Sequence, residues 1–218
     1  MLAPASPKTP IGSTAVMVPA VTIPPAAALL KPDPFSDPLI KQVVARQEKA
    51  VNGDEKETKA LTADLEKWTK EQPKNHLLQA YLGSLYTLCS RDAWPGPGKL
   101  SYLRNGGHLM NEAVAADPFN PAVRLVRAID FFELPAIFGQ RQKARDDFQF
   151  LLQQVNGEIR LPYALDKDTV QAICYYSGLS LRQQWQDDGA RAVWKRGWKL
   201  DPASPIGVKI KDELAKLQ

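Results

Sequence analysis

Few residues of the types that carry catalysis or bind metals occur in this sequence, and their spacing argues against both roles. His76 and His108 are its two histidines. Neither has a histidine or cysteine three or four residues away, where a helix would place a second metal ligand. No nucleophile stands at a suitable spacing from a base. The sequence therefore predicts a protein that is not an enzyme and that holds no metal and no cofactor.

Two pairs of adjacent aspartates, Asp146-Asp147 and Asp187-Asp188, are its most acidic features. Neighbouring side chains diverge on a helix, so the carboxylates of one pair cannot share a proton-transfer site. We interpret both pairs as solvated helix surface. One aspartate of the first pair could instead be the partner of Arg124 and Arg127, which lie one turn apart and need a carboxylate if they are buried.

A glycine-rich loop and a basic cluster suggest phosphate or nucleic-acid binding only at first sight. The loop Ala93–Ser101 has alanine in place of the first glycine of a phosphate loop and Leu100 in place of its hydroxyl residue. Pro95 and Pro97 remove N–H groups that a phosphate would need. In the cluster Trp194–Lys199 the tryptophans fall at core spacing, and the net charge of the chain is only +4. We expect no nucleic-acid partner.

Length and composition are those of an ordinary globular chain. The 218 residues are 44% hydrophobic and 24% charged, which suffices to bury a core. Cys89 and Cys174 fall in different predicted helix pairs, and we expect both to be free thiols packed among apolar side chains. No apolar run reaches the roughly 18 residues that a bilayer span requires, so no integral membrane segment is predicted.

The elements that would position a binding site follow a repeated pattern, which is clearest in Val170–Pro202. Two helices with a short turn are predicted there. Gly178 and Ala190 stand where the helix axes would come close, and Trp194 would fill the space beside that contact. Pro202 ends the unit, because proline lacks the N–H that a continuing helix needs.

Two further copies of this pattern come earlier, each lengthened by an insertion. One carries Gly83 and Gly106 on its two helices, has an insertion at 90–99 and ends at Asp117-Pro118. The next begins directly after that proline and has an insertion at 134–139. With these features the chain resembles the tetratricopeptide repeat (TPR) family. The resemblance implies an all-α, right-handed α-solenoid of stacked antiparallel helix hairpins, with about three full repeats plus capping helices.

The predicted domain organisation has two parts. Residues 1–35 are rich in proline and alanine and form a flexible arm or linker, and 36–218 form the TPR-like helical domain. Asp37-Pro38 opens that domain as an N-cap followed by proline at the first helical position. We predict an N-terminal hairpin, three repeats and a C-terminal capping helix, at 36–73, 74–118, 119–157, 167–202 and 203–218. Whether an export signal has been removed stays open, so we expect a soluble protein in the cytoplasm or, as the alternative, an exported, periplasmic one.

In the resembled family, partner segments lie in a concave groove lined by the first helices of the hairpins. The resemblance therefore implies a non-catalytic scaffold or adaptor that binds a protein or peptide partner. Carried over by register, the groove positions are Ser84, Thr87, Leu88, Leu125, Ile129, Phe132, Glu133, Tyr175, Leu179, Arg182 and Gln183. They hold few charges, so an extended apolar or helical segment is the expected ligand.

Two alternatives remain open at this point. The insertions at 90–99 and 134–139 could fold over the groove and close a small-ligand or enzymatic pocket, which a deep polar cavity beneath them would favour. The chain could also associate with itself as a structural subunit. Several groove residues could moreover be covered by the C-terminal helix or by the long loops.

Overall fold

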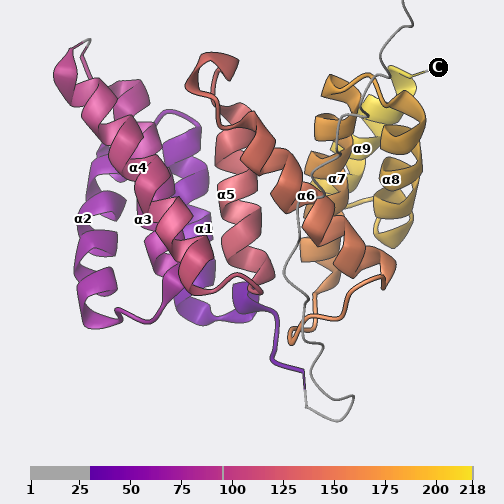
Figure 1. Cartoon of the computed structure of the whole chain (residues 1–218), viewed down its shortest axis with the longest axis horizontal. Coiled ribbons are helices and arrows are strands. Elements are labelled where there is room, and N and C mark those ends of the chain that lie inside the picture. The colour runs from indigo at the N-terminus through magenta and orange to yellow at the C-terminus, as the bar shows by residue number, and fades with distance from the viewer. Residues whose placement is uncertain (1–29, 95, 218) are drawn as a thin grey trace, which may run out of the picture.

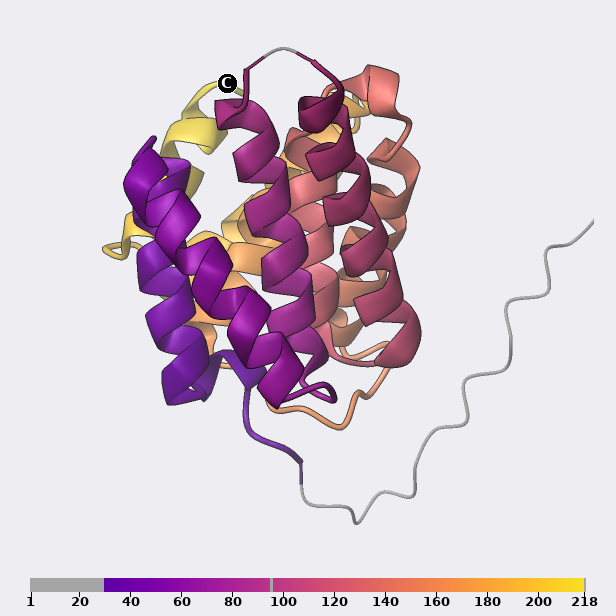
Figure 2. The same ribbon diagram turned by 90° about the vertical axis from the view of Figure 1, so that its left-hand side faces the viewer.

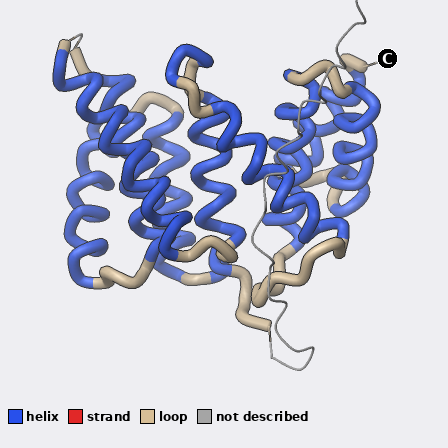
Figure 3. The backbone as a smooth tube through the Cα atoms, in the orientation of Figure 1, coloured by secondary structure: helices blue, strands red, loops and turns tan. Residues whose placement is uncertain are grey.

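The computed structural model describes residues 30–94 and 96–217, and over these residues it confirms the all-α prediction. They form nine α-helices and two short 3₁₀ helices, with no strand (Figure 3). The α-helices are α1 (Pro38–Val51), α2 (Glu55–Glu71), α3 (His76–Asp92), α4 (Pro97–Ala116), α5 (Pro121–Glu133), α6 (Arg141–Asn156), α7 (Lys167–Gln183), α8 (Asp187–Leu200) and α9 (Pro205–Ala215). The 3₁₀ helices are η1 (Pro34–Ser36) and η2 (Ala136–Phe138).

The helices pack as successive antiparallel pairs in the order of the chain (Figure 1). α1 pairs with α2, α3 with α4, α5 with α6 and α7 with α8, while α9 packs on both α7 and α8. The first helix of each pair also contacts the first helix of the next, so α1, α3, α5 and α7 form one row. Figure 2 faces the α1–α2 end of this series. The hairpin at the N-terminal end thus joins its neighbours in the same way as the later pairs do.

Side-chain caps explain why helices begin where the sequence predicts. Oδ1 of Asp37 accepts hydrogen bonds from the N–H groups of Leu39 (2.7 Å) and Ile40 (3.2 Å) at the start of α1. Oγ of Ser204 accepts one from the N–H of Gly207 (2.9 Å) at the start of α9. In both helices a proline follows the cap, where its missing N–H is not needed and its fixed φ suits the first turn.

Glycines lie where two helices of a pair come closest. A Cβ atom on Gly106 would lie 2.5 Å from the carbonyl oxygen of Gly83, and one on Gly83 would lie 2.7 Å from that of Gly106. Gly178 faces the indole of Trp194, which is fully buried and donates a hydrogen bond to the carbonyl oxygen of Tyr175 (3.0 Å). The axes of α3 and α4, and of α7 and α8, can approach this closely only without side chains at these positions.

Buried apolar side chains connect each pair to the next. One cluster joins α1 to α5, a second joins α4 to α7, and a third joins α7 to α9. Both cysteines are free thiols as predicted, Cys174 buried and Cys89 partly buried. Together the three clusters hold the row of first helices in place.

The two insertions differ in how much loop they contain. At 90–99 the loop is short, because α3 continues to Asp92 and α4 already begins at Pro97. The expectation of a loop over the whole of Ala93–Ser101 is therefore wrong: proline at the first helical position is compatible with helix and here starts one. At 134–139 the chain forms η2 and ends it at Gly139, whose φ of 67° lies in the left-handed region.

Asp147 is fully buried, so the interpretation of the first aspartate pair as solvated surface is wrong for this residue. Its carboxylate accepts hydrogen bonds from Nη1 of Arg124 (2.6 Å) and from Nε and Nη2 of Arg127 (2.7 and 2.9 Å). Arg127 also donates to Oδ1 of Asn111 (3.1 Å). Asp146 is exposed, as are both members of the second pair. Of the two interpretations, ion pairing with the arginines of α5 therefore holds for Asp147.

Residues 31–33, which we assigned to the arm, contact the loop between α6 and α7. The N–H of Lys31 donates to the carbonyl oxygen of Pro162 (2.7 Å), and the N–H of Ala164 donates to the carbonyl oxygen of Lys31 (2.8 Å). Asp33 is buried, and its Oδ2 accepts a hydrogen bond from the N–H of Asp166 (2.8 Å). Pro34 and Phe35, also assigned to the arm, begin η1, and Phe35 packs against the apolar core. Residues 1–29 lie outside the described residues.

Trp185 has an unusual backbone conformation for its side chain. Its φ is 61°, the only positive φ of a non-glycine residue in the described part of the chain, and its side chain is 92% exposed. The left-handed conformation costs about 1 kcal/mol at a residue with a Cβ atom, and glycine avoids this cost. We therefore expect Trp185→Gly to raise the free energy of unfolding by about 1 kcal/mol, measured by urea denaturation. Trp185→Ala, which keeps a Cβ atom, should give a smaller gain, and an equal gain would exclude backbone strain as the cause.

Candidate functional site

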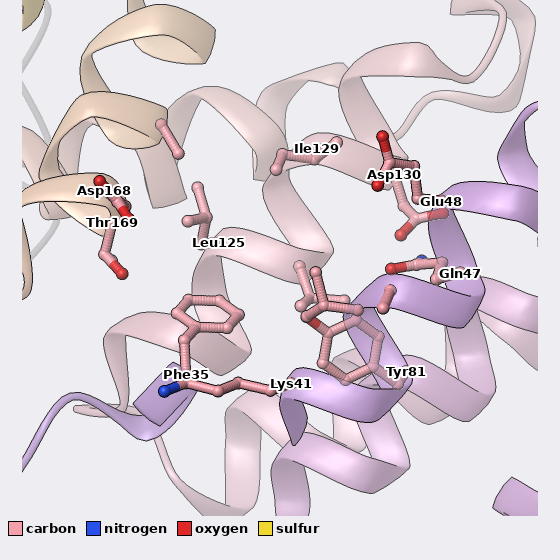
Figure 4. Close-up of a pocket in the computed structure, with 14 residues that line it drawn as sticks. Phe35, Lys41, Gln47, Glu48, Tyr81, Leu125, Ile129, Asp130, Asp168 and Thr169 are labelled. Atoms are coloured by element: carbon pink, nitrogen blue, oxygen red, sulfur yellow. The ribbon is translucent and has the colours of Figure 1, made fainter. Parts of the chain in front are cut away.

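Two neighbouring cavities open along the row of first helices, and together we call them the groove. Cavity A, of about 500 Å³, lies between α1, α3, α5 and α7 (Figure 4). Cavity B, of about 800 Å³, lies between α1, α3, α4, α5, α7 and the segment that follows α5. Gln47, Ile129 and Asp130 line both cavities and form the wall that they share. The groove therefore runs across several helix pairs.

Part of the predicted groove set lies in these cavities. Leu125 and Ile129 line cavity A. The residues that line cavity B are Ser84, Thr87, Leu88, Ile129 and Glu133. All of them come from α3 and α5, where the register of the repeat places them on the first helices.

The other predicted groove residues line neither cavity. Phe132 packs edge-on against Phe148, with ring centroids 6.1 Å apart. The other four residues lie on α7. Tyr175 and Leu179 pack against the core cluster of α8 and α9. Arg182 forms an ion pair with Glu213 of α9 (2.5 Å), and Gln183 is exposed. For Tyr175, Leu179 and Arg182 the reason is that α9 packs on α7, and the sequence had left open that the C-terminal helix could cover groove residues.

The sequence pattern missed the part of the site that α1 supplies. Lys41, Val44, Ala45, Gln47 and Glu48 all line cavity A. They were not proposed because the N-terminal hairpin carries no clear copy of the repeat pattern. Its capped start at Asp37-Pro38, which resembles the starts of α5 and α9, was the available signal that α1 belongs to the row.

Asp130 holds a carboxylate at the junction of the two cavities. Oγ1 of Thr87 lies 2.9 Å from its Oδ1 and also 2.7 Å from the carbonyl oxygen of Ser84, so these two acceptors share one hydroxyl proton. Nε2 of Gln47 donates to Oγ of Ser84 (2.6 Å), which leaves the Ser84 proton free to face Asp130. None of the ion pairs within the described residues involves Asp130.

Burial raises the pKa of Asp130 to about 6. Hydrogen bonds from Ser84 and Thr87 counteract this shift in part, and the carboxylate of Glu133 adds to it. The phenol of Tyr81 lies in the same wall, and its own pKa is raised by burial and by the charge of Asp130. The Asp130 side chain is partly buried. A carboxylate that loses part of its contact with water and lacks a cation destabilises the folded state when it is ionised.

This gives a prediction for Asp130→Asn. Because the pKa of Asp130 is higher in the folded than in the unfolded chain, the folded state binds more protons between about pH 4 and 6, and stability falls as the pH rises through that window. Asparagine avoids this loss. At pH 8 the variant should be about 1–2 kcal/mol more stable than the wild type, and at pH 4 the difference should disappear. Thermal unfolding across this pH range measures it.

The control for this prediction is Asp146→Asn, which changes an exposed carboxylate on α6. It should show no such dependence on pH. A difference between wild type and Asp130→Asn that is the same at pH 4 and pH 8 would contradict the placement of Asp130.

No protein-family model, curated protein or solved structure matches the chain. Its function must accordingly be inferred from the groove itself. Among the described residues, no cluster of three or more histidine, cysteine or acidic side chains is arranged to hold a metal ion. His108 lies 3.3 Å from Glu112, but both side chains are exposed. In the same part of the chain, no helix is both long enough and apolar enough to cross a bilayer.

Proposed function

We propose that the chain is a right-handed TPR-like α-solenoid, that it is a scaffold and not an enzyme, and that it holds a segment of a partner protein in the groove. The resemblance in sequence and the successive helix pairs support the repeat architecture. The observation that carries the binding role is the row of first helices with its two adjoining, mainly apolar cavities. In stacked helical hairpins, such a surface is the one that remains available to a partner.

Exposed apolar side chains in the groove support this proposal. Val44 is 40% exposed and lies in cavity A, while Val51 and Leu100 are 54% and 62% exposed and lie in cavity B. Apolar side chains left in contact with water in a concave surface mark interaction sites. Either cavity alone has the volume of a small-molecule site, but side by side they form a longer surface that suits an extended segment.

Site-specific photocrosslinking tests the proposal. The full chain, with a photoreactive amino acid at Val44 or at Leu100, is expressed in cells of the organism from which it comes. Both positions should crosslink to the same segment of one partner protein. The matched control is Val208, which is 49% exposed on α9 and lies outside both cavities. A synthetic copy of the recovered segment should compete at both groove positions. Equal crosslinking from Val208, or adducts that the synthetic segment does not displace, would contradict groove binding.

A small-ligand pocket is the second candidate, and one observation favours it. Both insertions contribute to the wall of cavity B: Ser90, Arg91 and Lys99 come from the first, and Leu134, Pro135 and Phe138 come from the second. The wall is mainly apolar, whereas a polar cavity was expected for such a pocket, so the ligand would be an apolar small molecule. Native mass spectrometry of the intact chain distinguishes the two functions. A bound small molecule that Leu100→Asp releases would favour the pocket over the scaffold.

A further inference from the structure

The charges that line the groove are unlike those of the chain as a whole. The chain carries a net charge of +4, yet the groove is lined by four carboxylates: Glu48, Asp130, Glu133 and Asp168. Within the described part of the chain none of the four takes part in an ion pair. In Figure 4, Glu48 and Asp130 lie at one end of cavity A and Asp168 lies at the other.

The basic side chains of the groove do not neutralise Asp130. Arg91 is committed elsewhere, because it donates to the carboxylate of Asp92 (2.6 and 3.1 Å) and to the carbonyl oxygens of Ala50 and Val51 at the end of α1 (both 2.9 Å). Lys41 is exposed, and its ammonium group points away from Asp130 in Figure 4. Lys99 is partly buried in the wall of cavity B and forms no ion pair there.

The surroundings of Asp130 suit one kind of side chain. Ser84 and Thr87 hold the carboxylate in place, and Ile129 lies beside it in the wall that both cavities share. A lysine or arginine side chain has an aliphatic stem and a cationic end, so its stem can pack on apolar surface while its end meets a carboxylate. A cation at this position would also remove the cost of keeping the Asp130 carboxylate unpaired.

We propose that the groove recognises a partner segment with a lysine or arginine between apolar residues, and that the cationic group binds Asp130. This inference rests on the proposed scaffold function and adds the chemistry of the partner. The apolar neighbours of the basic residue occupy cavity A on one side and cavity B on the other. The proposed ligand is thus a protein segment and not a free amine, because an amine alone would leave the apolar walls of both cavities uncovered.

Three synthetic peptides test the charge requirement with the full chain. They are acetyl-Leu-Ala-Lys-Ala-Leu-amide and the same peptide with norleucine or glutamate in the central position. Binding is followed at pH 8 by the amide chemical shifts of α3 and α5 in NMR titrations. We expect the lysine peptide to bind at least about tenfold more tightly than the norleucine peptide, which is about 1.4 kcal/mol, and the glutamate peptide to bind more weakly than both.

Asp130→Asn should abolish the preference for lysine over norleucine, while Asp146→Asn should retain it. At pH 5 the preference should also disappear in the wild type, because Asp130 is then largely protonated. The other charged groups that line the groove are the carboxylates Glu48, Glu133 and Asp168 and the cations Arg91, Lys41 and Lys99. The phenols of Tyr81 and Tyr176 also lie close enough to interact with the charge of Asp130.

Several outcomes would overturn the inference. Equal binding of the lysine and norleucine peptides would show an apolar groove without a charge requirement, which leaves the scaffold function standing. If neither the lysine nor the norleucine peptide bound at a peptide concentration of about 1 mM, the inference would be rejected. The crosslinking experiment would then show separately whether the groove binds a partner. Pentylammonium binding as tightly as the lysine peptide would identify a small amine as the ligand. Chemical-shift changes in α3 and α5 that depend on protein concentration alone, without peptide, would identify a second copy of the chain as the ligand of the groove.

Discussion

Replacing Asp147 with alanine is expected to lower the free energy of unfolding by about 3–5 kcal/mol. The carboxylate of Asp147 is fully buried and accepts three hydrogen bonds from Arg124 and Arg127. The side chains of these arginines are only 16% and 12% exposed. Without Asp147 their charges would remain largely buried with no carboxylate. At roughly 2–4 °C per kcal/mol for a chain of this size, the melting temperature should fall by about 10 °C.

The neighbouring residue supplies the control. Asp146→Ala removes an exposed carboxylate whose contact is a hydrogen bond from Gln142 on the same helix (2.8 Å). We expect it to change the free energy of unfolding by less than about 0.5 kcal/mol. If both variants were equally stable, the ion-pair cluster between α5 and α6 would not stabilise the fold as described. The triple replacement Asp147→Leu, Arg124→Leu and Arg127→Met should recover much of the lost stability, because apolar packing can replace a buried ion pair.

Gly106→Ala should be the most damaging single-methyl addition between α3 and α4. The new Cβ atom would lie 2.5 Å from the carbonyl oxygen of Gly83, an atom of the backbone that no side-chain rotation can move away. The two helices would have to separate along their contact, and overpacking of this kind costs about 1–3 kcal/mol or more. Denaturant unfolding followed by circular dichroism measures the loss.

Gly107→Ala is the matched control, one residue further along α4. A Cβ atom there would meet the ring of Phe131 at 3.9 Å, which is ordinary van der Waals contact. Because alanine has a higher helix propensity than glycine, this variant should gain up to about 1 kcal/mol. A similar loss in both variants would mean that the close approach of α3 and α4 is not what requires glycine at Gly106.

Local features of the fold could be predicted from the sequence because their cause is local. The cap at Asp37-Pro38 fixes the start of α1 through side-chain and backbone groups within three residues. Gly83, Gly106 and Gly178 lie at helix contacts, as their places in the predicted helix pairs indicated. The same reasoning placed Leu88 and Ile129 on the helices that line the groove.

What could not be predicted depends on contacts between distant residues. Nothing in the spacing around Arg182 shows that it pairs with Glu213 of α9 and so lies outside the groove. The burial of Asp147 beside the exposed Asp146 follows only from the position of α6 against α5. Asp130 was not among the predicted groove residues, because its place between two cavities depends on α1 and α3.

The contact between residues 31–33 and the loop before α7 affects how the chain unfolds. Arrays in which each unit touches only its neighbours can fray from either end, one unit at a time. Here the hydrogen bond from the N–H of Asp166 to Asp33 spans 133 residues of sequence, so opening the segment before α1 also releases the loop that leads into α7. This hydrogen bond couples the opening of α1 to the opening of α7. Amide hydrogen exchange in these two helices should therefore report one shared opening event.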